Sequence, residues 1–170
     1  QMCIRDSENS AKSRMSTKLQ TRSVKVAIIQ TRNDISPKSN VILDMMLPMI
    51  EKAASEEVEL ILLPELATNE YIWHSSQWKY GEPDDGYSVQ FLGKHAQRLS
   101  IYVGYTFIEV DKYTLDFYNT FIMIDDNGSI IAKIRKNTPC AFEAWYWSNK
   151  SNDKHVFDTE EFGKIAMGIC

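Results

Sequence analysis

The sequence predicts an α/β domain that begins with parallel strands. Two apolar runs rich in strand-forming residues, 24–29 and 59–63, are separated by a segment whose apolar residues recur at helical spacing. Parallel strands need a crossover of this kind, so the order β-α-β indicates a sheet with helices packed outside it. The chain has 170 residues, of which 44% are hydrophobic, which suffices for one domain with a core but not for two comfortable ones.

The first helix has clear sequence signals. Ser36 is a suitable N-cap, and Pro37 suits the first helical position. Apolar residues mark one helical face at positions 42, 45, 46, 49, 50, 53 and 54. Pro48 lies inside this pattern and is predicted to kink or break the helix, because proline removes a main-chain hydrogen bond. The strand 59–63 follows and leads to Glu65.

The rest of the chain is predicted to alternate between loops and short regular elements. The stretch 66–88 is too long for a simple connector and is predicted to be an active-site or oligomer-facing loop. The segment Asp125-Asp126-Asn127-Gly128 is a strong hairpin turn signal. The predicted elements after the loop are a helix at 87–99, strands at 101–107, 119–124 and 129–134, and closing strands at 156–157 and 164–169.

Composition excludes several classes of partner. Residues 26–170 carry 13 Lys/Arg against 21 Asp/Glu, and an acidic body without a basic stripe argues against nucleic-acid binding. No stretch reaches the roughly 20 apolar residues of a membrane span. Three cysteines and three histidines show no ligand-like spacing, so no metal site is predicted. Sparse thiols fit a reducing compartment, and we expect a cytoplasmic protein.

The chain divides into a lead and a domain. Residues 1–23 are polar and basic and lack the apolar segment of a secretory signal, so they are expected to be a disordered or non-native lead. Residues 24–170 form the predicted domain.

Three reactive side chains stand at predicted strand ends. Glu65 follows the strand 59–63, Lys136 follows 129–135, and Cys170 ends an apolar run that is predicted to be a buried strand. Ligands of open α/β sheets bind at the carboxyl ends of strands, so these three side chains are expected to converge there. Taken singly, each has an ordinary explanation: a lone cysteine is more often a small buried hydrophobe, and the two charged residues are common in solvated positions.

Four short motifs occur in order along the chain: Leu63-Pro64-Glu65, Tyr118-Asn119-Thr120, Gly128 with the strand into Arg135-Lys136, and Gly168-Ile169-Cys170. In this combination the chain resembles the nitrilase superfamily of carbon-nitrogen hydrolases, from about Val24 to its last residue. The resemblance implies that Glu65, Lys136 and Cys170 are catalytic and that Glu143 is a supporting second glutamate. It also implies an α-β-β-α sandwich that assembles into a homodimer or larger homo-oligomer. Family members continue after the nucleophile, so we expect an amino-terminal fragment that is incomplete at its C-terminus.

The residue types suit amide hydrolysis without a metal or an organic cofactor. Glu65 as general base would take the thiol proton of Cys170, and the thiolate would attack the amide carbon. Lys136 would stabilise the oxyanion that develops. Release of ammonia or an amine would leave a thioester for water to hydrolyse. Glu143, seven residues after Lys136, would orient the lysine or that water.

The stretch from Lys136 to Tyr146 resembles amidase-like members most closely, which favours an amide or carbamoyl amine as the small-molecule substrate. Nitrile hydrolysis by the same residues is the alternative. Tyr71 and Trp145 are candidates for the substrate pocket because aromatic walls suit small ligands, and core packing explains them equally well. Family members often carry a glycine where this chain has Glu70, so the loop before Tyr71 is expected to differ.

Two other classes of function stay open on the sequence. A non-catalytic interaction module would keep the fold for assembly and would not need an intact set of Glu65, Lys136 and Cys170. A thiol redox sensor would form a disulfide between Cys140 and Cys170 on mild oxidation.

Overall fold

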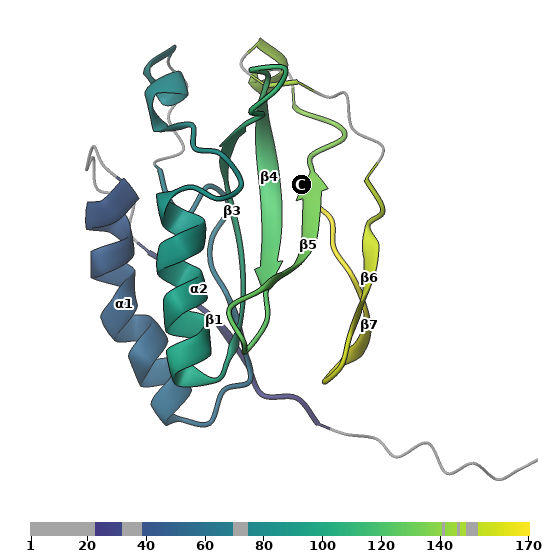
Figure 1. Ribbon diagram of the computed structural model, residues 1–170. Helices are drawn as coiled ribbons and strands as arrows, with labels where there is room; N and C mark the ends of the chain where they lie inside the picture. The colour runs from purple at the N-terminus through teal and green to yellow at the C-terminus, as the bar shows by residue number, and fades with distance from the viewer. Residues whose placement is uncertain (1–22, 32–38, 70–74, 141, 146, 149–152) are drawn as a thin grey trace, which may run out of the picture.

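The computed structural model describes residues 23–31, 39–69, 75–140, 142–145, 147–148 and 153–170 (Figure 1). In chain order the elements are β1 (Val26–Ile28), α1 (Ser39–Ser55), β2 (Leu60–Leu62), the 3-10 helix η1 (Ser75–Tyr80), α2 (Tyr87–Leu99), β3 (Tyr102–Val110), β4 (Phe117–Ile124), β5 (Ile130–Arg135), the 3-10 helix η2 (Glu143–Trp145), β6 (Val156–Thr159) and β7 (Gly163–Ala166).

The elements form three layers. A five-stranded sheet with the order β1-β2-β3-β4-β5 lies in the middle; β1, β2 and β3 are parallel, and β3, β4 and β5 are antiparallel. Helices α1 and α2 cover one face of this sheet, and the two-stranded sheet of β6 and β7 lies on the other side (Figure 1). The described residues therefore build the helix, sheet and sheet layers of the expected α-β-β-α sandwich, and the α/β class is confirmed.

The first β-α-β unit forms as predicted, with one exception. The predicted helix start at Ser36 and Pro37 lies outside the described residues. Pro48 is predicted to kink or break the helix. The break does not occur, because Pro48 lies inside α1, which spans Ser39–Ser55. Core packing explains this outcome: Leu43, Met46 and Ile50 are at most 1% exposed, and burial of this face offsets the hydrogen bond that proline cannot make.

The second helix and the central hairpin match their predicted positions. The helix α2 spans the predicted residues 87–99, whereas β3 and β4 are longer than predicted. The turn between β4 and β5 is held by Asp125, whose Oδ1 accepts the main-chain N–H groups of Asn127 at 3.0 Å and Ser129 at 2.7 Å. Gly128 has φ +82°, and an added Cβ would come within 2.6 Å of the carbonyl oxygen of Gly93. Glycine is therefore required here by both conformation and space.

The loop predicted for 66–88 is partly structured. It contains η1, and Glu82 forms a bridge to β3: its N–H donates to Ile108 O at 3.0 Å, and its own carbonyl accepts the N–H of Val110 at 2.9 Å. These two bonds place the segment beside the second half of β3, where β2 has already ended.

The prediction of a buried strand over the last seven residues is wrong. The strand β7 ends at Ala166, its residues are exposed or partly exposed, and Cys170 is exposed. Among the described residues β7 pairs only with β6. Burial of a strand on both faces requires a covering layer, and only the side chains that point toward the large sheet, among them Met167 and Ile169, pack against it.

Two apolar clusters hold the layers together. One lies between the helices and the large sheet and includes Leu43, Leu92 and Phe107. The other lies between the two sheets, where Phe121 and Met123 meet side chains of the β6–β7 hairpin and the residues after it. Within the described residues, no helix combines the length and the apolar character that crossing a membrane requires.

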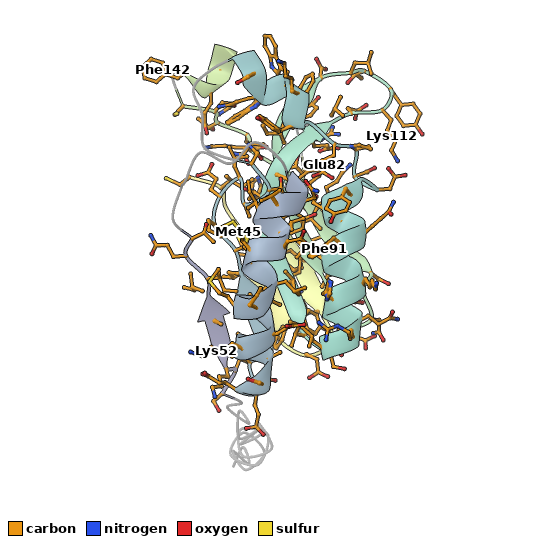
Figure 2. All side chains as sticks on the ribbon, turned by 90° about the vertical axis from the view of Figure 1, so that its left-hand side faces the viewer. Met45, Lys52, Glu82, Phe91, Lys112 and Phe142 are labelled. Carbon is orange, nitrogen blue, oxygen red and sulfur yellow. The ribbon has the colours of Figure 1, made fainter. Side chains whose placement is uncertain are left out.

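Two adjacent methionines of α1 provide a matched test of the helix layer. Met46 is 1% exposed, whereas Met45 is 60% exposed on the outer side of the helices (Figure 2). We expect Met46→Ala to lower the free energy of unfolding by about 2–5 kcal/mol, because it leaves a cavity in the core. Met45→Ala should change it by less than about 0.5 kcal/mol. Urea denaturation followed by circular dichroism measures both, and equal effects would contradict the described packing of α1.

Candidate functional site

Glu65 lies just beyond the carboxyl end of β2. The turn that follows it is attached to β3: the N–H of Leu66 donates to Thr106 Oγ1 at 2.5 Å, and the N–H of Ala67 donates to the carbonyl of Thr106 at 2.9 Å. Leu66 itself has φ 52°, a conformation that a non-glycine residue adopts only where its surroundings impose it. The side chain of Glu65 is 31% exposed, so it is held at a defined place but remains accessible.

Lys136 follows β5 and reaches two carboxylates. Its main-chain N–H donates to the carbonyl of Asn119 at 2.8 Å, which fixes the end of β5 against β4. Its Nζ lies 3.1 Å from Glu65 Oε1 and 2.8 Å from the carboxylate of Glu143. Glu143 begins η2 and is fully buried, and its Oε2 also accepts the N–H of Cys140 at 2.7 Å. The structure therefore brings three of the four predicted site residues into direct contact.

The charge of Lys136 is held firmly. Burial acts to lower the pKa of its ammonium group, but the hydrogen bonds to Glu143 and Glu65 outweigh burial, and the pKa lies above its usual value. Lys136 is thus a cation throughout the neutral range. Such a group suits the stabilisation of a developing negative charge and does not suit proton abstraction.

Cys170 faces Glu65 across a cleft of about 190 Å³. Both residues line it, together with apolar side chains that include Leu62, Phe121, Met167 and Ile169. The thiol is exposed, and among the described residues it makes no hydrogen bond to Glu65 or Lys136. Of the other three predicted residues, Glu65 alone lines the cleft with Cys170, and Lys136 and Glu143 lie behind Glu65.

The side chains of both aromatic pocket candidates lie outside the described part of the chain. Tyr71 lies outside the described residues. Trp145 belongs to η2 next to Glu143, and its side chain also lies outside the described part of the chain. Its neighbour Trp147 is 5% exposed and packs against Leu66 and Ile108, so that tryptophan belongs to the core under the turn after Glu65.

Sequence reasoning missed the role of Asn119 in the site. Its side chain is 1% exposed, and its Nδ2 donates to Glu65 Oε1 at 2.7 Å. The available signal was the polar pair Asn119-Thr120 in a strand, β4, whose other residues are apolar or aromatic, because polar residues need partners when they are buried.

A buried ion-pair network under β5 was also missed. Glu109 is 1% exposed, and its carboxylate accepts from Thr120 Oγ1 at 2.7 Å, from Lys133 Nζ at 3.0 Å and from Arg135 Nη2 at 2.6 Å. The guanidinium of Arg135 also lies 3.9 Å from the ring centre of Tyr118. These contacts join β3, β4 and β5 close to where Asn119 and Lys136 begin the site.

Loss of the Glu109 carboxylate is expected to destabilise the fold. Glu109→Ala leaves Arg135 partly buried without its main partner, and we expect a loss of about 3–5 kcal/mol in the free energy of unfolding. Asp158→Ala, which breaks an exposed ion pair with Lys164, should cost at most about 1 kcal/mol. Denaturation of both variants measures the difference, and equal losses would contradict a stabilising role for the buried network.

The same network predicts a pH dependence of stability. Burial alone raises the pKa of Glu109, but the hydrogen bonds from Arg135, Thr120 and Lys133 outweigh it and hold the pKa below its usual value. A lowered pKa stabilises the folded state at pH values above the unfolded pKa, which is about 4.3. The difference in stability between wild type and Glu109→Ala should therefore be constant above that pH and shrink as the pH falls through the folded pKa.

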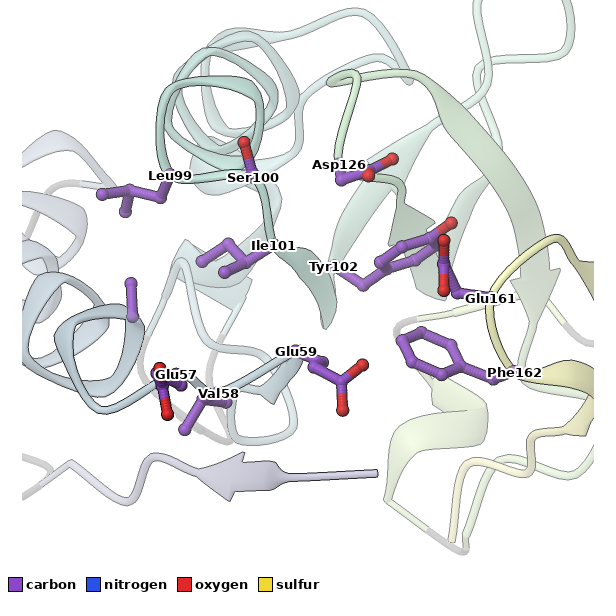
Figure 3. Close-up of a pocket in the computed structure, with 11 residues that line it drawn as sticks. Glu57, Val58, Glu59, Leu99, Ser100, Ile101, Tyr102, Asp126, Glu161 and Phe162 are labelled. Atoms are coloured by element: carbon purple, nitrogen blue, oxygen red, sulfur yellow. The ribbon is translucent and has the colours of Figure 1, made fainter. Parts of the chain in front are cut away.

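A larger cavity, of about 360 Å³, lies at the opposite end of β2 (Figure 3). Its lining includes the carboxylates of Glu57, Glu59, Asp126 and Glu161 and the rings of Tyr102 and Phe162 (Figure 3). None of the predicted site residues lines it. The cleft between Glu65 and Cys170 is therefore the candidate site.

Comparisons with known proteins identify the family of the chain. Residues 25–170 match the family model described as carbon-nitrogen hydrolase. The chain is 31% identical over 163 residues to beta-ureidopropionase of Arabidopsis thaliana, covering 88% of this chain and 40% of that protein. It is 30% identical over 169 residues to omega-amidase NIT3 of Saccharomyces cerevisiae, and the match covers 91% of this chain and 57% of that protein. The chain thus spans about half the length of these curated relatives.

A solved structure extends the comparison to the fold. The crystal structure of Saccharomyces cerevisiae Nit3, described as a member of branch 10 of the nitrilase superfamily, matches with a TM-score of 0.75 at 32% identity and covers 86% of this chain and 55% of that one. Because the family model spans nearly all of the chain and the arrangement of the strands agrees with a solved member, the chain belongs to the carbon-nitrogen hydrolase family, within the nitrilase superfamily.

Proposed function

We propose that the protein hydrolyses a non-peptide carbon-nitrogen bond, in an amide or a carbamoyl amine, through Glu65, Lys136 and Cys170. The observation that carries this proposal is the position of Lys136. It is a buried cation between two carboxylates, and one of these, Glu65, lines the same cleft as an exposed cysteine. A base, a fixed positive charge and a nucleophile are the three groups that acyl transfer through a thioester requires.

The proposed reaction has two halves. Glu65 takes the thiol proton, and the sulfur of Cys170 bonds to the carbonyl carbon while the carbonyl oxygen becomes an oxyanion beside Lys136. The C–N bond then breaks, the protonated Glu65 gives its proton to the leaving nitrogen, and ammonia or an amine departs. In the second half Glu65 takes a proton from water as the oxygen of that water attacks the thioester carbon. The C–S bond then breaks, Glu65 returns the proton to the sulfur of Cys170, and the acid is released.

Glu143 is proposed to act through Lys136. Both of its carboxylate oxygens are engaged, by Lys136 and by the N–H of Cys140, and the side chain is fully buried. A carboxylate in this situation is poorly placed to activate water in the cleft. Of the two roles that the sequence allows, orienting the lysine is therefore the one that the contacts support.

The substrate class is proposed from the relatives and the cleft. The names of three relatives fit an amide or carbamoyl substrate better than a nitrile: beta-ureidopropionase, omega-amidase and citrullinase. The apolar side chains that line the cleft favour a small apolar group next to the reacting carbon. Tyr71 and Trp145 remain candidates for the wall of this pocket, and a cytoplasmic homodimer or larger homo-oligomer remains the proposed state. The reaction as proposed needs no metal or organic cofactor.

A substrate panel tests the proposal. The full product of the gene that encodes this chain is incubated with simple amides, carbamoyl amines and nitriles, ammonia release is assayed, and intact mass is measured for an acyl adduct. Ammonia release together with an adduct on Cys170 supports the proposal and identifies the substrate class. An adduct on Cys140 contradicts the assignment of the nucleophile. A folded protein without turnover or adduct on any compound favours the interaction module.

A further inference from the structure

Asn119 contacts two polar residues of the proposed site, Glu65 through its side chain and Lys136 through its main chain. The amide Nδ2 donates to Glu65 Oε1 at 2.7 Å, and the carbonyl accepts the N–H of Lys136 at 2.8 Å. Asn119 lies on β4 opposite Ile108 of β3, in a regular part of the ladder, and is 1% exposed. It is therefore a rigid, buried group that fixes the relative position of Glu65 and Lys136.

The orientation of the amide follows from chemistry. A carboxylate only accepts hydrogen bonds, so Asn119 must present its NH₂ group to Glu65 and turn its oxygen away. That oxygen, Oδ1, is buried and has no hydrogen-bond partner among the described residues. Buried unpaired acceptors are rare because they cost free energy on folding. The amide therefore holds its bond to Glu65 although no described residue pairs with its oxygen.

The two oxygens of Glu65 are thereby made different. Oε1 accepts from both Asn119 and Lys136, whereas the described residues supply no donor to Oε2. An oxygen that already holds two hydrogen bonds is a poor acceptor for a further proton, and the unoccupied oxygen is the better one. The groups that face Glu65 are Lys136, with Glu143 behind it, and Cys170 across the cleft.

We propose that Asn119 is a positioning residue that engages Glu65 Oε1 and so leaves Oε2 as the oxygen that accepts the thiol proton of Cys170. The proposal rests on the proposed function, because it concerns how the base of that reaction is presented. It adds to that function a residue without which Lys136 is the one described donor that holds Glu65 Oε1.

The first test measures turnover in three variants. Asn119→Leu keeps the approximate volume and removes the donor; we expect kcat to fall on the order of 10–100-fold with KM nearly unchanged. Asn119→Asp puts a second carboxyl next to Glu65, and this new carboxyl can donate a hydrogen bond only when it is protonated. The activity of Asn119→Asp, relative to that of Asn119→Leu, should therefore recover as the pH falls. Thr120→Val is the matched control, because it removes a buried hydroxyl of the same strand whose partner is Glu109 and not Glu65. It should lower the stability of the protein without the selective fall in kcat.

The second test does not depend on a substrate. Cys170 is alkylated with iodoacetamide at several pH values, and Cys140, a second exposed thiol on the same molecule, serves as the internal control. We expect Glu65→Gln and Asn119→Leu both to slow alkylation of Cys170 relative to Cys140. If only Glu65→Gln slows the alkylation, the proposal for Asn119 is wrong, and Glu65 is kept as the general base. If neither variant slows it, the base assignment in the proposed function fails as well.

Discussion

Lys136→Met is expected to lower kcat/KM for the best amide substrate on the order of 100–1000-fold, the usual effect of losing a fixed oxyanion stabiliser. Methionine keeps the length and apolar stem of the side chain but removes the charge that lies between Glu65 and Glu143. The loss should fall on kcat more than on KM, because the charge on the substrate oxygen develops only in the transition state.

The same substitution leaves two carboxylates facing each other without a cation. Because Glu143 is fully buried, we also expect a loss of stability of about 3–5 kcal/mol, so folding must be measured beside activity. Lys136→Arg keeps a cation and should fold better than the methionine variant. Lys164→Met removes a lysine whose ion pair is exposed and serves as the control for lysine loss in general. A folded Lys136→Met protein that keeps more than a tenth of wild-type kcat/KM would remove Lys136 from the mechanism.

The pH dependence of the wild type gives a further check on Lys136. Its pKa lies above the usual 10.5, so the cation and its contribution to stability are fully present below that pH and are lost as the pH rises through the folded pKa. No fall in rate below pH 10.5 should therefore originate from this residue. A loss of activity near pH 8 that Lys136→Arg shifts upward would contradict a permanently charged lysine.

Cys170→Ala is expected to abolish turnover, with a loss on the order of 10⁴-fold or more, because Cys170 is the only thiol among the described residues that line the cleft. The residue is exposed, so the variant should fold and unfold as the wild type does. The acyl adduct seen by intact mass should disappear at the same time.

Cys140→Ala is the matched control for that experiment. Its thiol is also exposed and free, and its main-chain N–H, which bonds to Glu143, is retained in alanine. We expect ammonia release to stay near the wild-type rate. Turnover that survives in Cys170→Ala but is lost in Cys140→Ala would reverse the assignment of the nucleophile, and loss in both would point to a reaction that needs the two thiols together.

The sequence by itself determined the features that depend on neighbouring residues. Helical spacing and β-branched runs predicted the first β-α-β unit, the limits of α2 and the hairpin at Asp125–Gly128, because periodicity and turn chemistry act over a few residues. The motifs at strand ends also identified Glu65 and Lys136, which the structure places 3.1 Å apart although 71 positions separate them in the chain.

Only the tertiary structure decided which distant groups meet and which are covered. The bond from Asn119 to Glu65 spans 54 positions and depends on the order of the strands in the sheet, and the network around Glu109 depends on the register of β3, β4 and β5. Burial explains the two predictions that failed. Packing of one face kept α1 continuous through Pro48. The lack of a covering layer among the described residues left the segment up to Cys170 exposed. The physical reason is common to all of these features. Local preferences are worth about 1 kcal/mol per residue or less, apart from proline at about 3 kcal/mol, and the burial of a whole helix face or sheet outweighs them.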